Sequence, residues 1–381
     1  MEMVKRCLCR SEEDFKELLR TTNIRIFSYK EIQRATNNFD HGNKLGRGGF
    51  GTVYKGTFGD GTAFAAKVLS SESEQGVREF LTEIESIAEV KHANLVRLLG
   101  CCVQKQSRIL VYEYAENNSL DHALKALGSA SGATRLTWTV RSGICVGTAK
   151  GLSYLHEEHE PSIVHRDIKA SNVLLDGGYG PKIGDFGLAK LFPDSVTHIS
   201  TRVVGTTGYL APEYVVHGQL TKKADVYSFG VLLLEVISGR RVSQTIRSAD
   251  TFLVRQAWQL YEQGRPLDIV DAGIRDYPEA EVLRYIKVGL ACTQAAPSGR
   301  PTMGQVVKML MRPAALRELE LEMRPATTSW PVATSRISST NSASVAYSDI
   351  VPRQEAKKRK CRAFYIFITA QASEVRSVST N

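Results

Sequence analysis

The sequence contains few cysteines, and they form no recognisable framework. Seven cysteines are scattered over 381 residues, with neither a CxxC pair nor the Cys/His spacing of a zinc site. We therefore expect reduced thiols in a reducing compartment rather than a disulfide scaffold. Prolines number only 12 and glycines 30, while 43% of the residues are hydrophobic. This composition excludes collagenous, fibrous and wholly disordered proteins.

Long apolar runs are also missing. A membrane-spanning helix needs about 18 or more consecutive apolar residues, whereas residues 231–237 and 363–372 are much shorter runs and the first contains Glu235. The first ten residues lack the apolar core of a signal peptide. These absences predict a protein that stays in the cytoplasm.

Positive charge is in excess but is not concentrated. The chain has 49 basic and 40 acidic residues, a net charge of +9, of which residues 44–312 carry +4 and residues 313–381 carry +4. Only Lys357–Arg362 forms a dense basic run, which is more typical of a solvated or targeting segment than of a binding face. We expect no nucleic-acid partner.

The pattern of the chain changes near residue 136. Before it, β-rich runs at 52–58 and 62–69 flank Asp60 and Gly61, which predicts a hairpin. Apolar residues three and four apart predict one amphipathic helix over 75–90. After it, the strongest helical segments are residues 138–156, 224–238, 252–263 and 279–294. We expect a small β-rich lobe followed by a larger helical lobe, and a disordered tail at 312–381 that is rich in Ser and Thr.

A glycine-rich segment, Gly46–Gly51, matches the pattern GxGxxG. A dinucleotide-binding loop of this pattern opens into a helix, but here a β-type run follows. The segment is therefore interpreted as a flap between two strands, whose backbone amides can approach phosphate oxygens because no side chain blocks them. A tight hairpin turn without a ligand is the alternative.

Two charged residues of this first lobe are expected to pair. Lys67 ends the second β-rich run, and Glu83 lies among the apolar positions Phe80, Ile84 and Ile87 of the predicted helix. The Glu83 carboxylate should therefore point toward the sheet. A carboxylate buried there requires a cation, and Lys67 can supply it.

Three further motifs follow in order: the segment 163–174 (IVHRDIKASNVL), Asp185-Phe186-Gly187 and Ala211-Pro212-Glu213. Together with the glycine-rich segment and Lys67, they resemble the motifs of the eukaryotic protein kinases. The resemblance covers residues 43–311. It implies an α+β, two-lobed fold, with an N-lobe (43–115) made of an antiparallel sheet and one helix, and a mainly helical C-lobe (116–311).

Within that superfamily the chain resembles the plant receptor-like cytoplasmic kinases, including their cold-responsive type. The segments that carry this likeness are Phe27–Ile32, Ala35–Phe39, Asn117–Leu120, Gly205–Tyr214 and Arg300–Met303. The resemblance implies protein substrates with Ser or Thr hydroxyls, an upstream receptor kinase as a partner, and a place in receptor-linked or stress signalling. Lys169, two residues after Asp167, follows the serine/threonine rather than the tyrosine kinase pattern.

The resemblance also implies roles for individual residues. Asp167 would accept the proton of the substrate hydroxyl, and Lys169 would neutralise charge on the transferred group. Asn172 and Asp185 would bind Mg²⁺, with Mn²⁺ as an alternative. The residues expected to contact ATP are Leu45, Gly46, Arg47, Gly48, Gly49, Phe50, Gly51, Val53, Ala65, Lys67, Tyr112, Glu113, Ala115 and Leu174. Ordinary core packing describes Val53 and Leu174 equally well.

Other residues would support or regulate the site. Glu83 would orient Lys67, and Thr206 resembles a substrate-loop threonine that contacts the catalytic Asp. Structural roles are expected for Arg166, Glu213, Asp225 and Arg300. Activation-loop phosphorylation is expected at Thr197, Ser200 or Thr201, with Thr201 preferred, because Arg166 beside Asp167 calls for a negative partner.

Two other readings are open. A pseudokinase would bind ATP without transferring phosphate, although no catalytic group is missing from the motifs. A membrane-associated scaffold is the second, because Cys7 and Cys9 lie beside basic residues in the lead-in segment 1–42 and resemble a palmitoylation site. N-myristoylation is excluded by Glu2. Lipidation would give peripheral association with the inner face of the plasma membrane; plain free thiols are the alternative.

Overall fold

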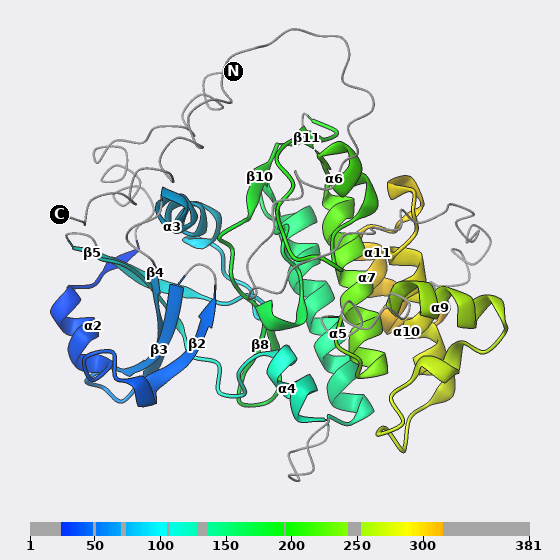
Figure 1. The fold of residues 1–381 in the computed structure, drawn as a ribbon, viewed down its shortest axis with the longest axis horizontal. Helices are drawn as coiled ribbons and strands as arrows, with labels where there is room; N and C mark the ends of the chain where they lie inside the picture. Colours follow the sequence, from blue (N-terminus) through cyan, green and yellow to red (C-terminus); the bar gives the residue numbers. More distant parts are fainter. Residues whose placement is uncertain are drawn as a thin grey trace, which may run out of the picture.

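The structure is a computed structural model that describes residues 24–48, 51–69, 74–104, 107–127, 136–193, 196–242 and 253–314. In this part of the chain a sheet-containing lobe adjoins a larger helical lobe (Figure 1), which confirms the predicted two-lobed α+β arrangement. Cys7, Cys9, Gly49, Phe50 and the expected tail beyond residue 314 lie outside the described residues.

The N-lobe is built on one six-stranded sheet of order β1-β5-β6-β4-β3-β2. Its neighbouring strands are antiparallel, except that β1 runs parallel to β5. The elements are β1 (Arg25–Ile26), α2 (Tyr29–Ala35), β2 (Lys44–Gly48), β3 (Gly51–Thr57), β4 (Ala63–Leu69), α3 (Glu74–Ile87), β5 (Leu98–Gln104) and β6 (Ser107–Glu113).

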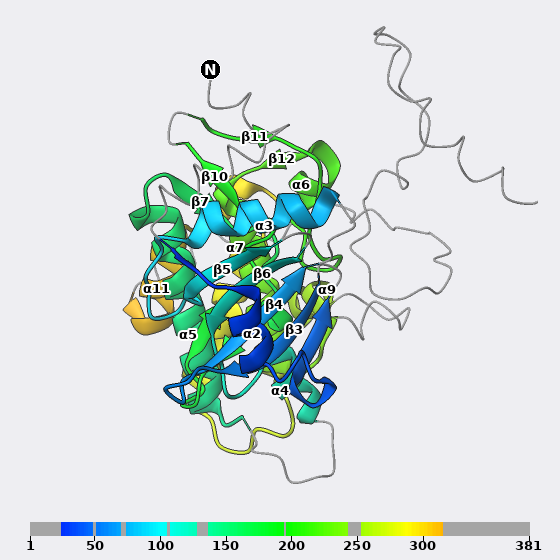
Figure 2. The same ribbon diagram turned by 90° about the vertical axis from the view of Figure 1, so that its left-hand side faces the viewer.

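Both faces of this sheet are covered, and side-chain alternation along the strands divides the core in two. Cys101 and Leu110 join the core on the α3 side, whereas their neighbours Cys102 and Val111 join the core on the α2 side. Because successive side chains of a strand point to opposite faces, one strand serves both cores. Figure 2 shows α2 in front of the sheet and α3 running across its upper end.

The hairpin predicted at Asp60 and Gly61 joins β3 to β4. The Asp60 carboxylate accepts the N–H of Thr62 at 2.9 Å, and the N–H of Gly61 donates to the carbonyl of Phe58 at 3.0 Å. Gly61 has φ +87°, a left-handed conformation that glycine adopts without a Cβ clash. The Asp-Gly pair therefore closes the turn as its sequence indicated.

The described part of the lead-in packs against the outer face of the sheet. Phe27 stacks on Phe58 with ring centroids 5.5 Å apart, and its N–H donates to the carbonyl of Cys101 at 2.8 Å. Ser28 caps α2 by accepting the N–H of Glu31, and Ile32 on α2 is fully buried. Residues 25–35 thus complete the second core of the N-lobe.

The C-lobe is mainly helical and also contains short paired strands. Its helices are α4 (Leu120–Ala126), α5 (Trp138–Ser153), α6 (Pro212–His217), α7 (Lys222–Ser238), α9 (Leu253–Glu262), α10 (Glu279–Cys292) and α11 (Met303–Met311). Its strands are β7 (Ser162–Val164), β8 (Val173–Leu175), β9 (Pro181–Ile183), β10 (Lys190–Phe192), β11 (Ile199–Ser200) and β12 (Gln219–Leu220). The four predicted helical segments correspond to α5, α7, α9 and α10.

Helix α7 forms the centre of this lobe. Every residue from Ala224 to Ser238 is buried, as expected of a helix that is covered on all sides. Thr221 caps its start by accepting the N–H of Lys223, and Gly239 ends it in the left-handed conformation with φ +64°. Helices α5, α9 and α10 pack around it (Figure 1).

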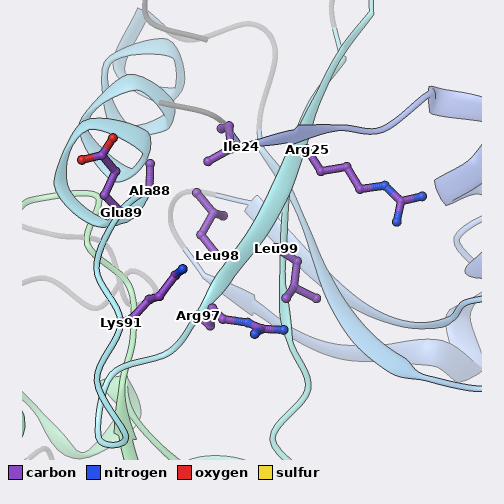
Figure 3. A pocket seen from close by; sticks show the side chains of 8 residues that line it. All are labelled: Ile24, Arg25, Ala88, Glu89, Lys91, Arg97, Leu98 and Leu99. Carbon is purple, nitrogen blue, oxygen red and sulfur yellow. The ribbon is translucent and has the colours of Figure 1, made fainter. Parts of the chain in front are cut away.

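A pocket lies on the N-lobe between the start of β1, the end of α3 and β5 (Figure 3). Ile24, Ala88 and Leu98 give it apolar walls, and Lys91 stands at its rim. None of its lining residues belongs to the motifs listed above. Among the described residues, no helix is both long and apolar enough to cross a membrane.

Replacing Ile32 by Ala tests whether the lead-in contributes to stability. The change empties a fully buried position, so we expect the free energy of unfolding to fall by about 2 to 5 kcal/mol, as measured by urea denaturation. Lys30→Ala, on the exposed face of the same helix, is the control and should change it by less than about 0.5 kcal/mol. Equal effects of the two changes would contradict the packing role of α2.

Candidate active site

Three charged residues from separate elements meet where the lobes join. Lys67 lies on β4, Glu83 on α3, and Asp185 follows β9. The Lys67 ammonium donates to both Glu83 oxygens at 3.0 Å and to Oδ1 of Asp185 at 2.6 Å. The predicted Lys67–Glu83 pair is therefore formed, and it extends to the first residue of the Asp-Phe-Gly motif.

Burial and the mutual attraction of the three charges compete in setting the pKa values of this group. Burial disfavours the Lys67 ammonium, but the carboxylates of Asp185 and Glu83 outweigh it and raise the pKa of Lys67. Burial raises the pKa of Glu83, an effect that Lys67 only partly offsets. For Asp185, burial is outweighed by Lys67, and the pKa is lowered. Asp185 therefore stays ionised, which suits a group that binds a cation.

A second cluster surrounds Asp167. Its Oδ2 accepts the Lys169 ammonium at 2.7 Å, and its Oδ1 accepts the hydroxyl of Thr206 at 2.7 Å. Lys169 also donates to the Thr206 oxygen at 2.9 Å. The structure thus brings together the three residues that the motifs assigned to catalysis and to the substrate loop. Asp167 itself is nearly buried, with 5% of its surface exposed, so its carboxylate is held in one orientation.

Asn172 and Asp185 fit a divalent metal. The Asn172 amide nitrogen donates to the carbonyl and to Oδ2 of Asp167 at 2.9 and 3.1 Å, which leaves the amide oxygen free to act as a ligand. Asp185 uses Oδ1 for Lys67 and retains its second oxygen. No group of three or more His, Cys, Asp and Glu side chains in the described ranges could hold a metal ion. Two hard oxygen ligands suit Mg²⁺, which keeps waters and substrate phosphates in its shell.

A buried carboxylate on α7 holds the catalytic loop. Asp225 accepts the backbone N–H groups of His165 and Arg166 at 2.7 and 2.8 Å, and the ring nitrogen of His156 at 2.9 Å. Burial would raise the pKa of Asp225, but the hydrogen bond from His156 and nearby positive groups lower it. Arg166 is held at φ +72°, an uncommon conformation for a residue with a side chain.

Glu213 and Arg300, which were expected to have structural roles, form an ion pair. The Arg300 guanidinium donates to both Glu213 oxygens at 2.7 and 2.8 Å, and it also donates to the carbonyls of Gln294, Ala295 and Lys223. A fully buried guanidinium is stable only when its donors are satisfied in this way. The pair fastens α6, and with it the end of the segment 185–213, to the C-terminal helices.

Arg166 does not meet the three expected phosphorylation sites directly. Its guanidinium donates to the hydroxyl of Tyr214 and to the carbonyls of Leu188 and Arg202, and no carboxylate among the described residues pairs with it. Ser200 is exposed on β11, and the N–H of Thr201 donates to the carbonyl of Gly218. Thr197 is exposed as well. Thr201 directly precedes Arg202, whose carbonyl accepts from Arg166.

The glycines of the 46–51 segment are glycine for different structural reasons. A Cβ on Gly51, at φ +154°, would lie 2.2 Å from the carbonyl oxygen of Val68, so the turn geometry itself requires glycine. A Cβ on Gly46 or Gly48 would meet nothing within 4 Å, and Arg47 between them is exposed. A tight hairpin without a ligand would explain why residue 51 is glycine, but not why residues 46 and 48 are. The open space beside Gly46 and Gly48 would let a phosphate approach the backbone closely.

The expected adenine slot draws on both lobes. Leu45 on β2, Val53 on β3 and Ala65 on β4 are half-buried, as is Leu174 on β8 of the C-lobe. Gly46 pairs with Val53 in the sheet, and Ala65 pairs with Tyr112. Three of these four apolar side chains therefore come from the N-lobe sheet, and the fourth comes from the β8–β9 pair of the C-lobe.

The segment joining the lobes supplies the polar edge of this slot. The N–H of Glu113 is taken by the carbonyl of Arg97 at 3.1 Å, so it is not available to a ligand. The N–H of Ala115 has no acceptor among the described residues. Tyr112 is buried beside Glu83, and burial together with that carboxylate raises the pKa of its phenol.

Three residues near the site were not identified from the sequence. His156 has no motif signal, and its contact with Asp225 depends on the path of α5. The Tyr209 hydroxyl donates to one carboxylate oxygen of Glu235 on α7, and the other oxygen accepts the N–H of Val242 at 2.9 Å. Burial raises the pKa of Glu235 to about 7, partly offset by the Tyr209 bond. The only signal for Glu235 was a lone acidic residue in an apolar run.

The arrangement is that of a protein kinase, and the chain belongs to that family: the family model for the protein kinase domain matches residues 39–310. The relatives are plant receptor-like kinases. The chain is 55% identical over 296 residues to Cold-responsive protein kinase 1 of Arabidopsis thaliana, covering 77% of this chain and 76% of that protein.

It is also 52% identical over 301 residues to a probable leucine-rich repeat receptor-like serine/threonine-protein kinase of the same plant, covering 78% of this chain but only 29% of that relative. A probable LRR receptor-like serine/threonine-protein kinase is 51% identical over 303 residues, with 29% of its length covered. The chain therefore spans less than a third of these longer receptors. By family it is a protein serine/threonine kinase.

The Glu235 carboxyl makes stability depend on pH in a defined direction. Its pKa is raised from 4.5 to about 7 in the folded protein, so the folded state binds the proton more tightly than the unfolded state. The contribution of Glu235 to the free energy of unfolding is fully present below about pH 4.5 and is lost as the pH rises through 7. Glu235→Gln should therefore reduce the fall in unfolding free energy between pH 5 and 8, by on the order of 3 kcal/mol.

Urea denaturation at a series of pH values measures this effect. Glu262→Gln, which removes an exposed carboxylate at the end of α9, is the control and should leave the wild-type slope unchanged. A Glu235→Gln profile parallel to the wild type would contradict the raised pKa.

Proposed function

We propose that the chain transfers the γ-phosphoryl group of Mg-ATP to Ser and Thr hydroxyls of protein substrates. The observation that carries this proposal is the Asp167 carboxylate fixed between Lys169 and Thr206, beside the Lys67–Glu83–Asp185 group. Phosphoryl transfer demands positioning and charge neutralisation more than covalent chemistry. These residues supply both.

Each side chain has one task in this scheme. The bare loop at Gly46 and Gly48 covers the phosphates, and Lys67, oriented by Glu83, neutralises the α and β groups. As the oxygen of the substrate hydroxyl attacks the γ-phosphorus, its proton goes toward Asp167, the bond between the γ-phosphorus and the β–γ bridging oxygen breaks, and ADP leaves. Lys169 stabilises the charge on the transferred group. Asn172 and Asp185 would hold Mg²⁺, with Mn²⁺ as a substitute, and the bound cation would neutralise phosphate charge.

The pseudokinase alternative has little support from the geometry. Pseudokinases lack a catalytic group or hold it out of place, whereas Lys67 is paired with Glu83, Asp185 is oriented by Lys67, and Asp167 is held by Lys169. We therefore favour an active enzyme. The adenine slot assigned to Leu45, Val53, Ala65 and Leu174 and the edge at Ala115 belong to this proposal.

The setting of the enzyme follows from the names of its relatives. Cold-responsive and receptor-like kinases support a place in receptor-linked or stress signalling, with an upstream receptor kinase as partner. We place the protein in the cytoplasm, and at the inner face of the plasma membrane if Cys7 and Cys9 are palmitoylated.

Asp167→Asn tests the proposed function. Phosphate incorporation from Mg-ATP into a generic protein substrate should fall roughly 100-fold or more, because general-base catalysis and orientation of the hydroxyl are both impaired. Phospho-amino-acid analysis of the wild-type product should give phosphoserine and phosphothreonine. Asp268→Asn, at an exposed carboxylate, is the control and should retain full activity. Undiminished incorporation by Asp167→Asn would refute the assignment.

A second change tests activation-loop phosphorylation. Ser200→Ala with Thr201→Ala removes the hydroxyls of the two residues that precede Arg202, whose carbonyl accepts from Arg166. A phosphate can then no longer form on these residues to pair with Arg166. After preincubation with ATP, we expect the kinase activity of the double variant to be several-fold lower than that of the wild type. After dephosphorylation, the wild type and the double variant should have equal activity. Full activity of the double variant after preincubation would exclude regulation at these residues.

A further inference from the structure

The hydroxyl of Tyr214 takes part in four hydrogen bonds. It accepts Nη2 of Arg166 at 2.7 Å and Nε of Arg166 at 3.3 Å. It also accepts the backbone N–H of Val204 at 3.2 Å and donates to the carbonyl of Arg202 at 3.0 Å. One oxygen atom therefore contacts both the catalytic loop, through Arg166, and the activation segment, through Val204 and Arg202.

The ring of Tyr214 is a rigid support for that oxygen. The residue is 2% exposed and lies in α6, the short helix that the Glu213–Arg300 pair fastens to the C-lobe. Pro212 begins this helix and Gly218 ends it in the left-handed conformation. The phenol is thus held at the fastened end of the activation segment (residues 185–213), by a helix that lies outside the catalytic loop.

Arg166 links the Tyr214 hydroxyl to Asp167, the residue that faces the substrate hydroxyl in the proposed mechanism. Its backbone N–H is held by Asp225, it precedes Asp167, and its guanidinium also reaches the carbonyls of Leu188 and Arg202. The part of the chain that the structure describes offers it no carboxylate. Tyr214 therefore supplies the acceptor that takes two donors of this half-buried cation.

We propose that the Tyr214 hydroxyl is a positioning group for Asp167, which it serves by holding the Arg166 guanidinium and the activation-segment residues Arg202 and Val204 in one arrangement. This inference rests on the proposed kinase activity. It concerns the oxygen atom, and not the packing of the ring. It also gives Arg166 a fixed partner that does not depend on phosphate.

Tyr214→Phe removes that oxygen and keeps the ring. With Mg-ATP and a peptide substrate, we expect kcat to fall roughly tenfold, as for the loss of one hydrogen bond to a charged group, while KM for ATP changes less than twofold. Tyr285→Phe removes the hydroxyl of another buried tyrosine, on α10, and should leave kcat unchanged. A thermal melt of each variant checks that the fold is retained.

Two further measurements separate positioning from general destabilisation. In hydrogen exchange of the full chain, a peptide covering residues 199–209 should exchange faster in Tyr214→Phe than in the wild type or Tyr285→Phe, because the N–H of Val204 has lost its acceptor. In a double-mutant cycle, Arg166→Met with Tyr214→Phe should lose no more activity than Arg166→Met alone. If the phenylalanine variant does not fold, Arg166→Met tests the same link from its other end, because it removes the donors that the Tyr214 hydroxyl accepts, and it should lower kcat whereas Tyr285→Phe should not.

The outcomes are distinct. Unchanged kcat and unchanged exchange in Tyr214→Phe would overturn the inference, and so would additive losses in the cycle, because the hydroxyl would then act independently of Arg166. If the wild type transfers no phosphate, the proposed function fails. The exchange comparison still decides in that case whether the hydroxyl joins the two segments.

Discussion

A single buried carboxylate, Asp225, fixes the position of the catalytic loop. It accepts two consecutive backbone N–H groups and a histidine ring nitrogen, and it lies on the most completely buried helix of the protein. An ionised group in such a place is stable only with its acceptor capacity filled. The loop that carries Asp167 is therefore tied to the core and not to the surface, and Asp167 inherits that rigidity.

The N-lobe residues depend on a different constraint, because they must meet the C-lobe across the junction. Lys67 links a strand and a helix of the sheet lobe to Asp185 of the helical lobe through one ammonium group. Glu83 gains this cation when α3 packs beside β4, and Asp185 shares it only when the Asp-Phe-Gly segment approaches the N-lobe. The alignment of the two lobes and the charge state of the site are thus set by the same contact.

Much of the fold and of the site could be predicted because short sequence patterns determine these elements and residues. The apolar spacing around Glu83 predicted the helix and the direction of its carboxylate, and Asp60 with Gly61 predicted the hairpin. The residues missed are those whose partners are distant in sequence. His156 and Asp225 are 69 positions apart, and the acceptor role of Tyr214 arises only when α6 packs beside the catalytic loop. Packing of Phe27 and Ile32 on the sheet was equally invisible to local periodicity.

The parallel strand β1 protects the edge of the N-lobe sheet. Without it, the backbone groups of Gly100 and Cys101 that now face β1 would be unpaired, and an unpaired strand edge is a template for pairing with another chain. With it, the outermost strand on that side is two residues long. Removing residues 25 and 26 would therefore leave this part of β5 open for pairing with another chain, quite apart from any loss of stability in the core beneath it.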